Sequence, residues 1–518
     1  MSHVLQKMDM SRLTILALVI SLASLGAPST TPIGTTAGIV NGVALDGVTV
    51  YKGIPYAAPP TGPLRWKAPQ PATKWEGVRD ASEFGPMCPQ TGYPQGSIYY
   101  SPPEKQSEDC LSLNIWAPAA APNEHRPVMV WIHGGGFTRG TGSTPTYDGG
   151  SLARKGVVVV TINYRLGALG FLAHPELTAE SENKSSGNYA LLDQIEALRW
   201  VKQNIAAFGG DPNRVTIFGE SAGSWAVNCL VATPLARGLF HRAIGESGGS
   251  FGPMSRLDAS EKAGVAFGKA VGAESLEALR ALPPEKILDQ QESSRISPNV
   301  DGWVLPDEVR AIFAAGKHND VPVLIGSNAN EMTTLAVPAA IPVTIEAYRK
   351  QVAPVYGSHM EEVDALYPAT TNEQAVQAYL SELRDITFTL PMRTWARATA
   401  KGKSSAYLYF FSHVPPNRNS KYLGAYHAGE IIYVFNNLAM RPQTAWGASD
   451  RELASQMSSY WVNFATSGDP NGQGLAVWKP YKRDSEYYMD LGDQPKLKQH
   501  LERDRLDFTE RMGLIRRR

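Results

Sequence analysis

The stretch Val215–Gly223, VTIFGESAG, decides the fold of this chain. Its first half is apolar and β-branched, as in a buried strand, and the residues after Gly223 can continue as a helix. A serine on the sharp turn between such elements needs small residues two positions to either side, because Cβ atoms there would meet the adjoining backbone. Gly219 and Gly223 meet this requirement. Ser221 is therefore the candidate nucleophile, at a helix start whose free N–H groups can stabilise negative charge.

Two further Gly-x-Ser-x-Gly patterns overlap within residues 245–252. Pro253 follows them, and no helix-forming stretch comes after it. We interpret this segment as a glycine-rich loop that cannot carry a nucleophile.

The composition is that of an ordinary globular protein, with 43% hydrophobic and 19% charged residues. Lys plus Arg equals Asp plus Glu at 49 each, so no overall charge attracts nucleic acid, and we expect no nucleic-acid partner. The three cysteines lack metal-ligand spacing, and we expect neither a metal nor another cofactor.

The N-terminus resembles a secretory signal peptide. Arg12 precedes an apolar run, Leu13–Leu25, that is too short to span a bilayer, and small and turn-forming residues follow. We expect residues 1–27 to be the signal peptide and cleavage to fall near Ser24 to Ala27. An uncleaved anchor, or a start at Met10, stays open.

We expect residues 28–518 to form a single domain that is secreted or periplasmic, without stable membrane insertion. The sequence does not indicate an oligomeric state. Three cysteines fit an exported protein with one disulfide, and a bond between Cys88 and Cys110 would close a loop of about 22 residues. Cys229 is expected to be a small buried core residue.

Strand-like runs alternate with helical stretches, which is typical of an α/β fold with a largely parallel sheet. Expected strands are 127–132, 156–163, 321–325 and 406–411. Residues 188–208 have the apolar spacing of a helix that packs on the sheet. Polar groups follow the ends of several strands, where open α/β sheets bind ligands, so a shared crevice is predicted. We interpret 233–320 and 333–405 as insertions that roof it.

A serine needs a histidine as its base. His427 lies in a loop between a strand and an apolar run, which makes it the best placed candidate. His413 and His241 are competitors that sequence position alone does not exclude.

The histidine in turn needs a carboxylate to hold its tautomer. Glu331 directly follows an expected strand. The chain order Ser221, Glu331, His427 is that of the α/β-hydrolases, which favours Glu331 over its alternative role as a solvated loop residue. The glycines 134–136 follow another strand and can turn N–H groups toward an oxyanion, with Ala222 as a further donor.

Four motifs together resemble the type-B carboxylesterases, the cholinesterase-like branch of the α/β-hydrolases. The motifs are GESAG at 219–223, HGGGF at 133–137, EDCLSLN at 108–114 and GIPYA at 53–57. The resemblance extends from about Gly38 to Met489. It implies a central, mostly parallel twisted sheet flanked by helices, with helical insertions roofing an active-site gorge.

The resemblance also implies residue roles. Ser221, Glu331 and His427 would form the catalytic triad, and the oxyanion donors would be Gly135, Gly136 and Ala222. Ser247 would support the acid, Glu220 would support the site without touching the substrate, and Cys88 would pair with Cys110. The family usually has Asp-Glu-Gly around its acid, whereas this chain has Asn330-Glu331-Met332, which leaves the geometry of that loop open.

The function expected from these residues is a serine carboxylesterase that hydrolyses small-molecule carboxylic esters through an acyl-enzyme. Two alternatives are a catalytically silent binding protein of the same fold and a lipase active at lipid interfaces. Trp225 and Phe137 could line an acyl pocket, although buried aromatic residues more often belong to the core. The sequence does not select a physiological ester.

Overall fold

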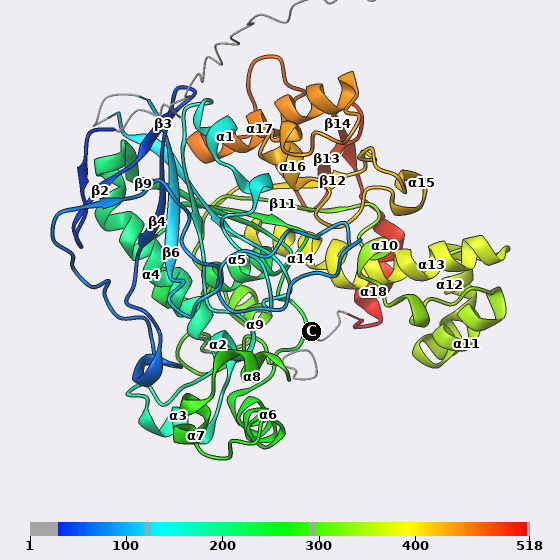
Figure 1. The fold of residues 1–518 in the computed structure, drawn as a ribbon. Helices are drawn as coiled ribbons and strands as arrows, with labels where there is room; N and C mark the ends of the chain where they lie inside the picture. The colour runs from blue at the N-terminus through cyan, green and yellow to red at the C-terminus, as the bar shows by residue number, and fades with distance from the viewer. Residues whose placement is uncertain (1–29, 120–123, 291–295, 515–518) are drawn as a thin grey trace, which may run out of the picture.

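The computed structural model describes residues 30–119, 124–290 and 296–514. At its centre lies an eleven-stranded sheet with the order β14-β13-β12-β11-β10-β9-β7-β8-β6-β4-β3 (Figure 1). The seven strands from β13 to β8 are parallel, and antiparallel strands complete both edges. A separate three-stranded sheet has the order β1-β2-β5. The predicted α/β fold with a mostly parallel sheet is confirmed.

The strands of the large sheet are β3 Val43–Leu45, β4 Val48–Pro55, β6 Ser112–Pro118, β7 Arg126–Ile132, β8 Val158–Ile162, β9 Gly210–Glu220, β10 Arg242–Glu246, β11 Val323–Asn328, β12 Ala406–Phe411, β13 Tyr487–Leu491 and β14 Lys496–Gln499. The small sheet comprises β1 Ile33–Gly34, β2 Ile39–Asn41 and β5 Val78–Asp80. The longer helices are α4 Tyr189–Asn204, α5 Ala222–Ala232, α6 Leu257–Ala270, α11 Ile345–Tyr356, α13 Asn372–Arg384, α14 Leu390–Thr399, α17 Ala448–Ser467 and α18 Arg503–Arg511.

Two hydrophobic cores cover the two faces of the sheet. Val128, Val130 and Ile132 of β7 pack in one core with α4 and α5. Met129 and Trp131, which alternate with them, pack in the other core with α17. Alternate side chains of a strand point to opposite faces, so a strand buried on both faces is apolar throughout. This explains why β7 could be recognised as an uninterrupted apolar run.

The helix expected at 188–208 is observed as α4, which is followed by a 3-10 turn, Ile205–Phe208. Gly209 ends the turn with a φ of 80°, a conformation that glycine adopts without strain. The helix therefore stops where the sequence indicated.

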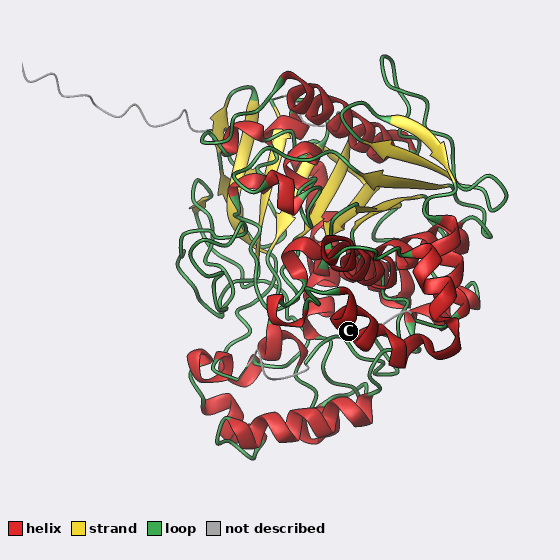
Figure 2. Cartoon of the chain, turned by 90° about the vertical axis from the view of Figure 1, so that its right-hand side faces the viewer, coloured by secondary structure: helices red, strands yellow, loops and turns green. Residues whose placement is uncertain are grey.

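Both predicted insertions contain helices. In Figure 2 most strands lie in one half of the molecule and many helices gather in the other. One expectation is wrong, because the interval 233–320 contains a central strand, β10, between β9 and β11. Gly245 and Glu246, interpreted as part of a loop, end this strand. The strand was missed because its sequence, RAIGE, has only one large apolar residue, Ile244, and its burial comes from neighbouring strands.

The expected signal peptide at 1–27 lies outside the described residues, and the single-domain boundaries stay a prediction. Across the ranges that the structure describes, no helix is long and apolar enough to cross a membrane.

Candidate active site

Ser221 lies on a sharp turn between β9 and α5. Its φ of 54° and ψ of −122° are strained for a residue with a side chain, and its N–H donates to the Glu246 carbonyl oxygen at 2.8 Å. A Cβ atom on Gly219 would lie 2.5 Å from the carbonyl oxygen of Ile132, and one on Gly223 would overlap the same oxygen. A larger residue at either position would therefore collide with the end of β7, the neighbouring strand.

His427 and Glu331 are in direct contact. The Nδ1 atom of His427 lies 2.6 Å from Oε2 of Glu331, and both side chains are buried. The other Glu331 oxygen, Oε1, accepts the backbone N–H of Asn328 at 2.7 Å. A carboxylate that accepts the Nδ1 proton fixes the tautomer in which Nε2 can take up a proton. The pair is therefore arranged to act as a base and its orienting acid.

Asn330 connects the loops that carry these two residues. Its N–H donates to the Ala425 carbonyl oxygen at 2.9 Å, and its Oδ1 accepts the Ala425 N–H at 2.9 Å. Asn330, which stands where the family usually has Asp, therefore links the Glu331 loop to the His427 loop by two hydrogen bonds.

The second ring nitrogen of His427 faces the end of β9. Nε2 lies 3.0 Å from Oε1 of Glu220, the neighbour of Ser221. This contact does not have the geometry of a hydrogen bond, and Glu220 Oε1 has no hydrogen-bond partner among the residues that the structure describes. Within the described residues no hydrogen bond joins Ser221 to His427. Catalytic hydrogen bonds are often long before substrate binds, so this geometry is compatible with a base next to its nucleophile.

The glycine-rich loop after β7 adopts conformations that suit glycine. Gly135 and Gly136 have φ values of 101° and 65°. In the described part of the chain, their N–H groups and that of Ala222 donate to no protein acceptor. His133 before them is buried, which lowers its pKa to about 4, so the ring is neutral at pH 7. Three unpaired donors near the nucleophile form a candidate oxyanion hole.

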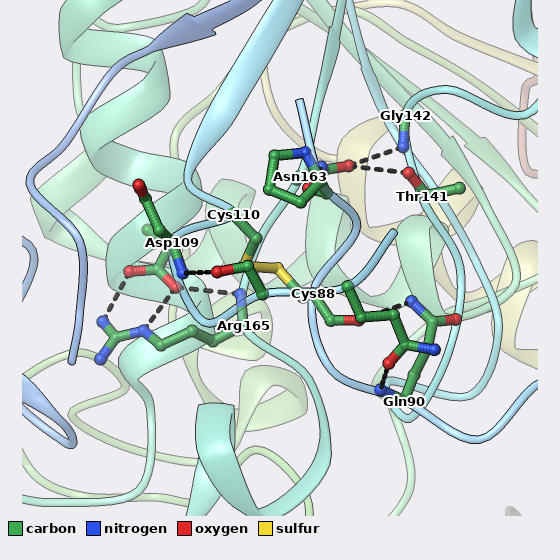
Figure 3. Close-up of a disulfide and its surroundings, with 12 residues drawn as sticks. Cys88, Gln90, Asp109, Cys110, Thr141, Gly142, Asn163 and Arg165 are labelled. Carbon is green, nitrogen blue, oxygen red and sulfur yellow. Dashed lines mark hydrogen bonds and ion pairs between the residues drawn. A yellow bond between two sulfur atoms is a disulfide. The ribbon is translucent and has the colours of Figure 1, made fainter. Parts of the chain in front are cut away.

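The segment 88–110 is closed by a disulfide between Cys88 and Cys110 (Figure 3). Inside it, the Gln90 amide donates to the Gly140 carbonyl oxygen at 2.8 Å and accepts the Gly140 N–H at 2.7 Å. The Tyr99 hydroxyl donates to the carbonyl oxygen of His427 at 2.8 Å. This segment, called the disulfide loop below, therefore contacts the regions of both the oxyanion glycines and the candidate base.

Four buried glutamates lie around the candidate site. They come from neighbouring strand ends and from the His427 loop: Glu220, Glu246, Glu331 and Glu430. Burial, followed by the charge of Glu331, raises the pKa of Glu430 to about 8. Burial and the nearby carboxylates also raise the pKa values of Glu220 and Glu246 well above the usual range. Much of this cluster is therefore protonated near neutral pH.

Ser247 contacts Glu430 and not the predicted acid. Its hydroxyl donates to Glu430 Oε1 at 3.4 Å, and the Asn328 amide donates to Glu430 Oε2 at 2.5 Å. Because the Asn328 backbone also donates to Glu331, the hydrogen bonds of the described residues connect Ser247 to the acid through Glu430 and Asn328.

The two alternative candidate bases, His413 and His241, do not lie next to Ser221. Both ring nitrogens of His413 contact carboxylates, Asp493 at 2.7 Å and Asp450 at 2.8 Å. His241 accepts the N–H of Val215, far upstream of Ser221 in β9. The structure brings only His427, of these three, to the end of β9 beside Ser221.

Sequence reasoning missed three residues of the site. Tyr99 lies in a polar loop without secondary structure, and Phe388 belongs to a π-helical turn, Asp385–Thr389. The Phe388 ring centroid is 5.1 Å from that of His427. Glu430 lies three positions after His427, and this closeness to the candidate base is the one signal in the sequence that could have identified it. Within the described ranges no group of His, Cys, Asp or Glu side chains is arranged to hold a metal ion.

Comparison with known proteins agrees with this geometry. The family model described as the carboxylesterase family matches residues 29–509. Fumonisin B1 esterase of Sphingopyxis macrogoltabida is 39% identical over 89% of this chain and 86% of its own length. Para-nitrobenzyl esterase of Bacillus subtilis is 36% identical over 87% of this chain and 92% of its own.

A human relative, cocaine esterase, is 35% identical over 94% of this chain and 92% of its own length. Among solved structures, a thermophilic para-nitrobenzyl esterase superposes with a TM-score of 0.80 at 34% identity, over 92% of this chain and 99% of that one. Sequence and fold therefore agree on one family.

Proposed function

Because this chain belongs to the carboxylesterase family and is a carboxylic ester hydrolase, we propose that Ser221, His427 and Glu331 are its catalytic triad. The observation that carries the proposal is the 2.6 Å contact between His427 Nδ1 and Glu331, with Nε2 directed to the turn that presents Ser221. A hydroxyl at this turn becomes an effective nucleophile only when a base accepts its proton.

The reaction follows from these positions. Ser221 Oγ attacks the ester carbonyl carbon while its proton passes to His427 Nε2. The carbonyl oxygen becomes an oxyanion that the N–H groups of Gly135, Gly136 and Ala222 stabilise. When the bond to the alcohol breaks, His427 returns the proton to the leaving oxygen. Water then cleaves the acyl-enzyme by the same route, and the acid leaves.

Glu331 holds the imidazole ring through its contact with Nδ1, and the ring becomes positively charged in each half-reaction. Glu220 and Ser247 are proposed to support the triad. Glu220 acts beside Nε2, and Ser247 acts through Glu430.

Substrates are small-molecule carboxylic esters, as in the family. The relatives are named for different esters, among them fumonisin B1 and cocaine, so the names do not select one for this chain. A lipase would show a rate increase above the solubility limit of its ester, which an esterase lacks.

We propose that the protein acts outside the cytoplasm, secreted or in a periplasm. The Cys88–Cys110 disulfide supports this, because such bonds persist in oxidising compartments.

The test compares Ser221→Ala with Ser224→Ala. Ser224 is a buried serine three positions along on α5, and its hydroxyl donates to the Gly248 carbonyl oxygen at 2.6 Å. With a para-nitrophenyl ester, Ser221→Ala is expected to lower kcat by several orders of magnitude, as in other serine hydrolases. Ser224→Ala should keep most of kcat. Comparable activity in Ser221→Ala and the unmodified protein would refute the triad.

A further inference from the structure

The π-helical turn Asp385–Thr389, called the π-turn below, lies against the candidate base. Its residue Phe388 is buried, and the centroid of the Phe388 ring is 5.1 Å from that of His427. Two side chains therefore contact the imidazole, Glu331 at Nδ1 and Phe388 beside the ring. π-Helical turns are rare and are frequently found at functional sites. The place of the π-turn thus affects how the base is oriented.

Both ends of the π-turn are hydrogen-bonded to the segment that carries Glu331. At its end, Thr389 accepts a hydrogen bond at 3.2 Å from the hydroxyl of Ser327, which belongs to β11. At its start, Arg384, the last residue of α13, donates from Nη1 to the Ala329 carbonyl oxygen at 3.1 Å. Ala329 lies between the end of β11 and Glu331, so Arg384 holds the Glu331 loop itself.

Arg384 also binds Asp385, the first residue of the π-turn. Its Nε and Nη2 donate to Oδ1 of Asp385 at 2.8 and 2.6 Å, and the Tyr367 hydroxyl donates to Oδ2 at 2.9 Å. Both residues of the ion pair are buried; burial raises the pKa of Asp385, and the charge of Arg384 opposes that shift. A guanidinium is planar and rigid, so it fixes the Ala329 carbonyl group relative to the Asp385 carboxylate.

We propose that Arg384 is a positioning residue of ester hydrolysis and acts on His427 through the π-turn. By joining the π-turn to the Glu331 loop, it holds the Phe388 ring against the imidazole whose Nδ1 Glu331 holds. This inference rests on the proposed triad, in which Nε2 must stay directed toward Ser221 while the proton moves. A displacement of about 1 Å in such a site can lower the rate roughly 100-fold.

A purely structural role for Arg384 would be to neutralise the buried charge of Asp385, and any cation could do this. Arg384→Lys separates the two roles, because it keeps the positive charge but replaces the planar fork with a single nitrogen atom. We expect kcat for para-nitrophenyl acetate to fall about tenfold and KM to stay within about twofold, since the change affects the base and not substrate binding.

Arg393→Lys is the matched control. Arg393 is a buried arginine of α14 whose ion pairs, with Asp507 at 2.7 Å and Glu510 at 3.2 Å, are made to α18. This variant is expected to lower the temperature of unfolding and to leave kcat within about twofold. An unchanged kcat in Arg384→Lys, or an equal fall of kcat in both variants, would overturn the proposal.

Phe388→Leu tests the route from Arg384 to His427, and it decides the question even if Arg384→Lys does not fold. Phe388→Leu alone is expected to lower kcat about tenfold. The double variant should lie within about twofold of the slower single variant, because both changes loosen the same contact. Losses that multiply in the double variant, or an unchanged kcat in Phe388→Leu, would overturn the proposal.

Ser221→Ala, measured beside these variants, keeps the two proposals apart. If the triad is wrong, Ser221→Ala still hydrolyses the acetate. If only the role of Arg384 is wrong, Ser221→Ala loses activity while Arg384→Lys keeps the kcat of the unmodified protein.

Discussion

His427 Nε2 lies 3.0 Å from Oε1 of Glu220, while its Nδ1 lies 2.6 Å from Oε2 of Glu331. The imidazole ring is thus placed between two buried carboxyl groups, one on each side. In the proposed reaction the ring becomes an imidazolium, and a negative charge on either side would stabilise it. Burial and the neighbouring carboxylates raise the pKa of Glu220, which disfavours its ionised form while the imidazole is neutral. The ionised form becomes more favourable once the ring is positively charged.

Glu220→Gln tests this arrangement, because glutamine keeps the shape but cannot ionise. We expect kcat to fall about tenfold with little change in KM, since the lost interaction develops in the transition state. Steady-state kinetics on a para-nitrophenyl ester measure the split. An unchanged kcat in a folded Glu220→Gln variant would show that Glu220 does not act on the imidazolium.

Glu430 makes stability depend on pH. Its pKa is about 8 in the folded protein, because burial and the charge of Glu331 disfavour its ionised form, and about 4.3 when unfolded. Between these values the folded state holds a proton that the unfolded state has lost. The contribution of Glu430 is therefore present below about pH 4.3 and is lost as the pH rises through about 8, by at most about 1.4 kcal/mol per pH unit.

Glu430→Gln removes this titration. Urea unfolding is expected to show that the free energy of unfolding of the variant, relative to the original protein, rises between about pH 5 and about pH 8. A difference that stays constant over this range would mean that Glu430 is already ionised in the folded state.

Tyr99→Phe removes one hydroxyl and little volume. That hydroxyl donates to the His427 carbonyl oxygen at 2.8 Å and contacts the Thr334 hydroxyl at 2.7 Å. We expect a loss of about 1 kcal/mol in stability and a several-fold lower kcat, because the loop that carries His427 is held less firmly. Thermal unfolding and kcat are the measurements. Tyr100→Phe, an exposed neighbour, serves as the control. Equal kcat values for both variants would contradict a positioning role for Tyr99.

Replacing Cys88 and Cys110 together by serine opens the disulfide loop. The bond spans 22 positions, and its loss is expected to lower stability by about 3 kcal/mol through the entropy of the unfolded chain. Activity should fall as well, because Gln90 and Tyr99 then lose their fixed positions against Gly140 and His427. Chemical unfolding and ester hydrolysis test the two effects separately. Full activity in the opened variant would show that the loop does not need the bond to hold the site.

Much of this fold is visible in the sequence because its central strands are buried on both faces. β7 is apolar from Pro127 to Ile132, β8 is apolar except for Thr161, and β12 matches its expected residues Ala406–Phe411. β10 was missed for the opposite reason, since its short sequence contains Gly245 and Glu246 and acquires its burial from β9 and β11.

The residues of the candidate site also differ in how well the sequence predicts them. The turn at Ser221 could be predicted because a local steric rule specifies Gly219 and Gly223. The contact of Glu331 with His427 spans 96 positions, and only chain order and family resemblance suggested it. Tyr99 and Phe388 act through contacts with distant residues, and their own neighbourhoods in the sequence have no pattern that indicates such contacts.

The identity of the nucleophile is tested most directly by labelling with a serine-directed fluorophosphonate and locating the adduct by peptide mass spectrometry. The account predicts one adduct per chain, on Ser221, with ester hydrolysis lost in proportion to labelling. An adduct on another serine that accounts for the lost activity, or full hydrolysis by a protein labelled completely at Ser221, would contradict it.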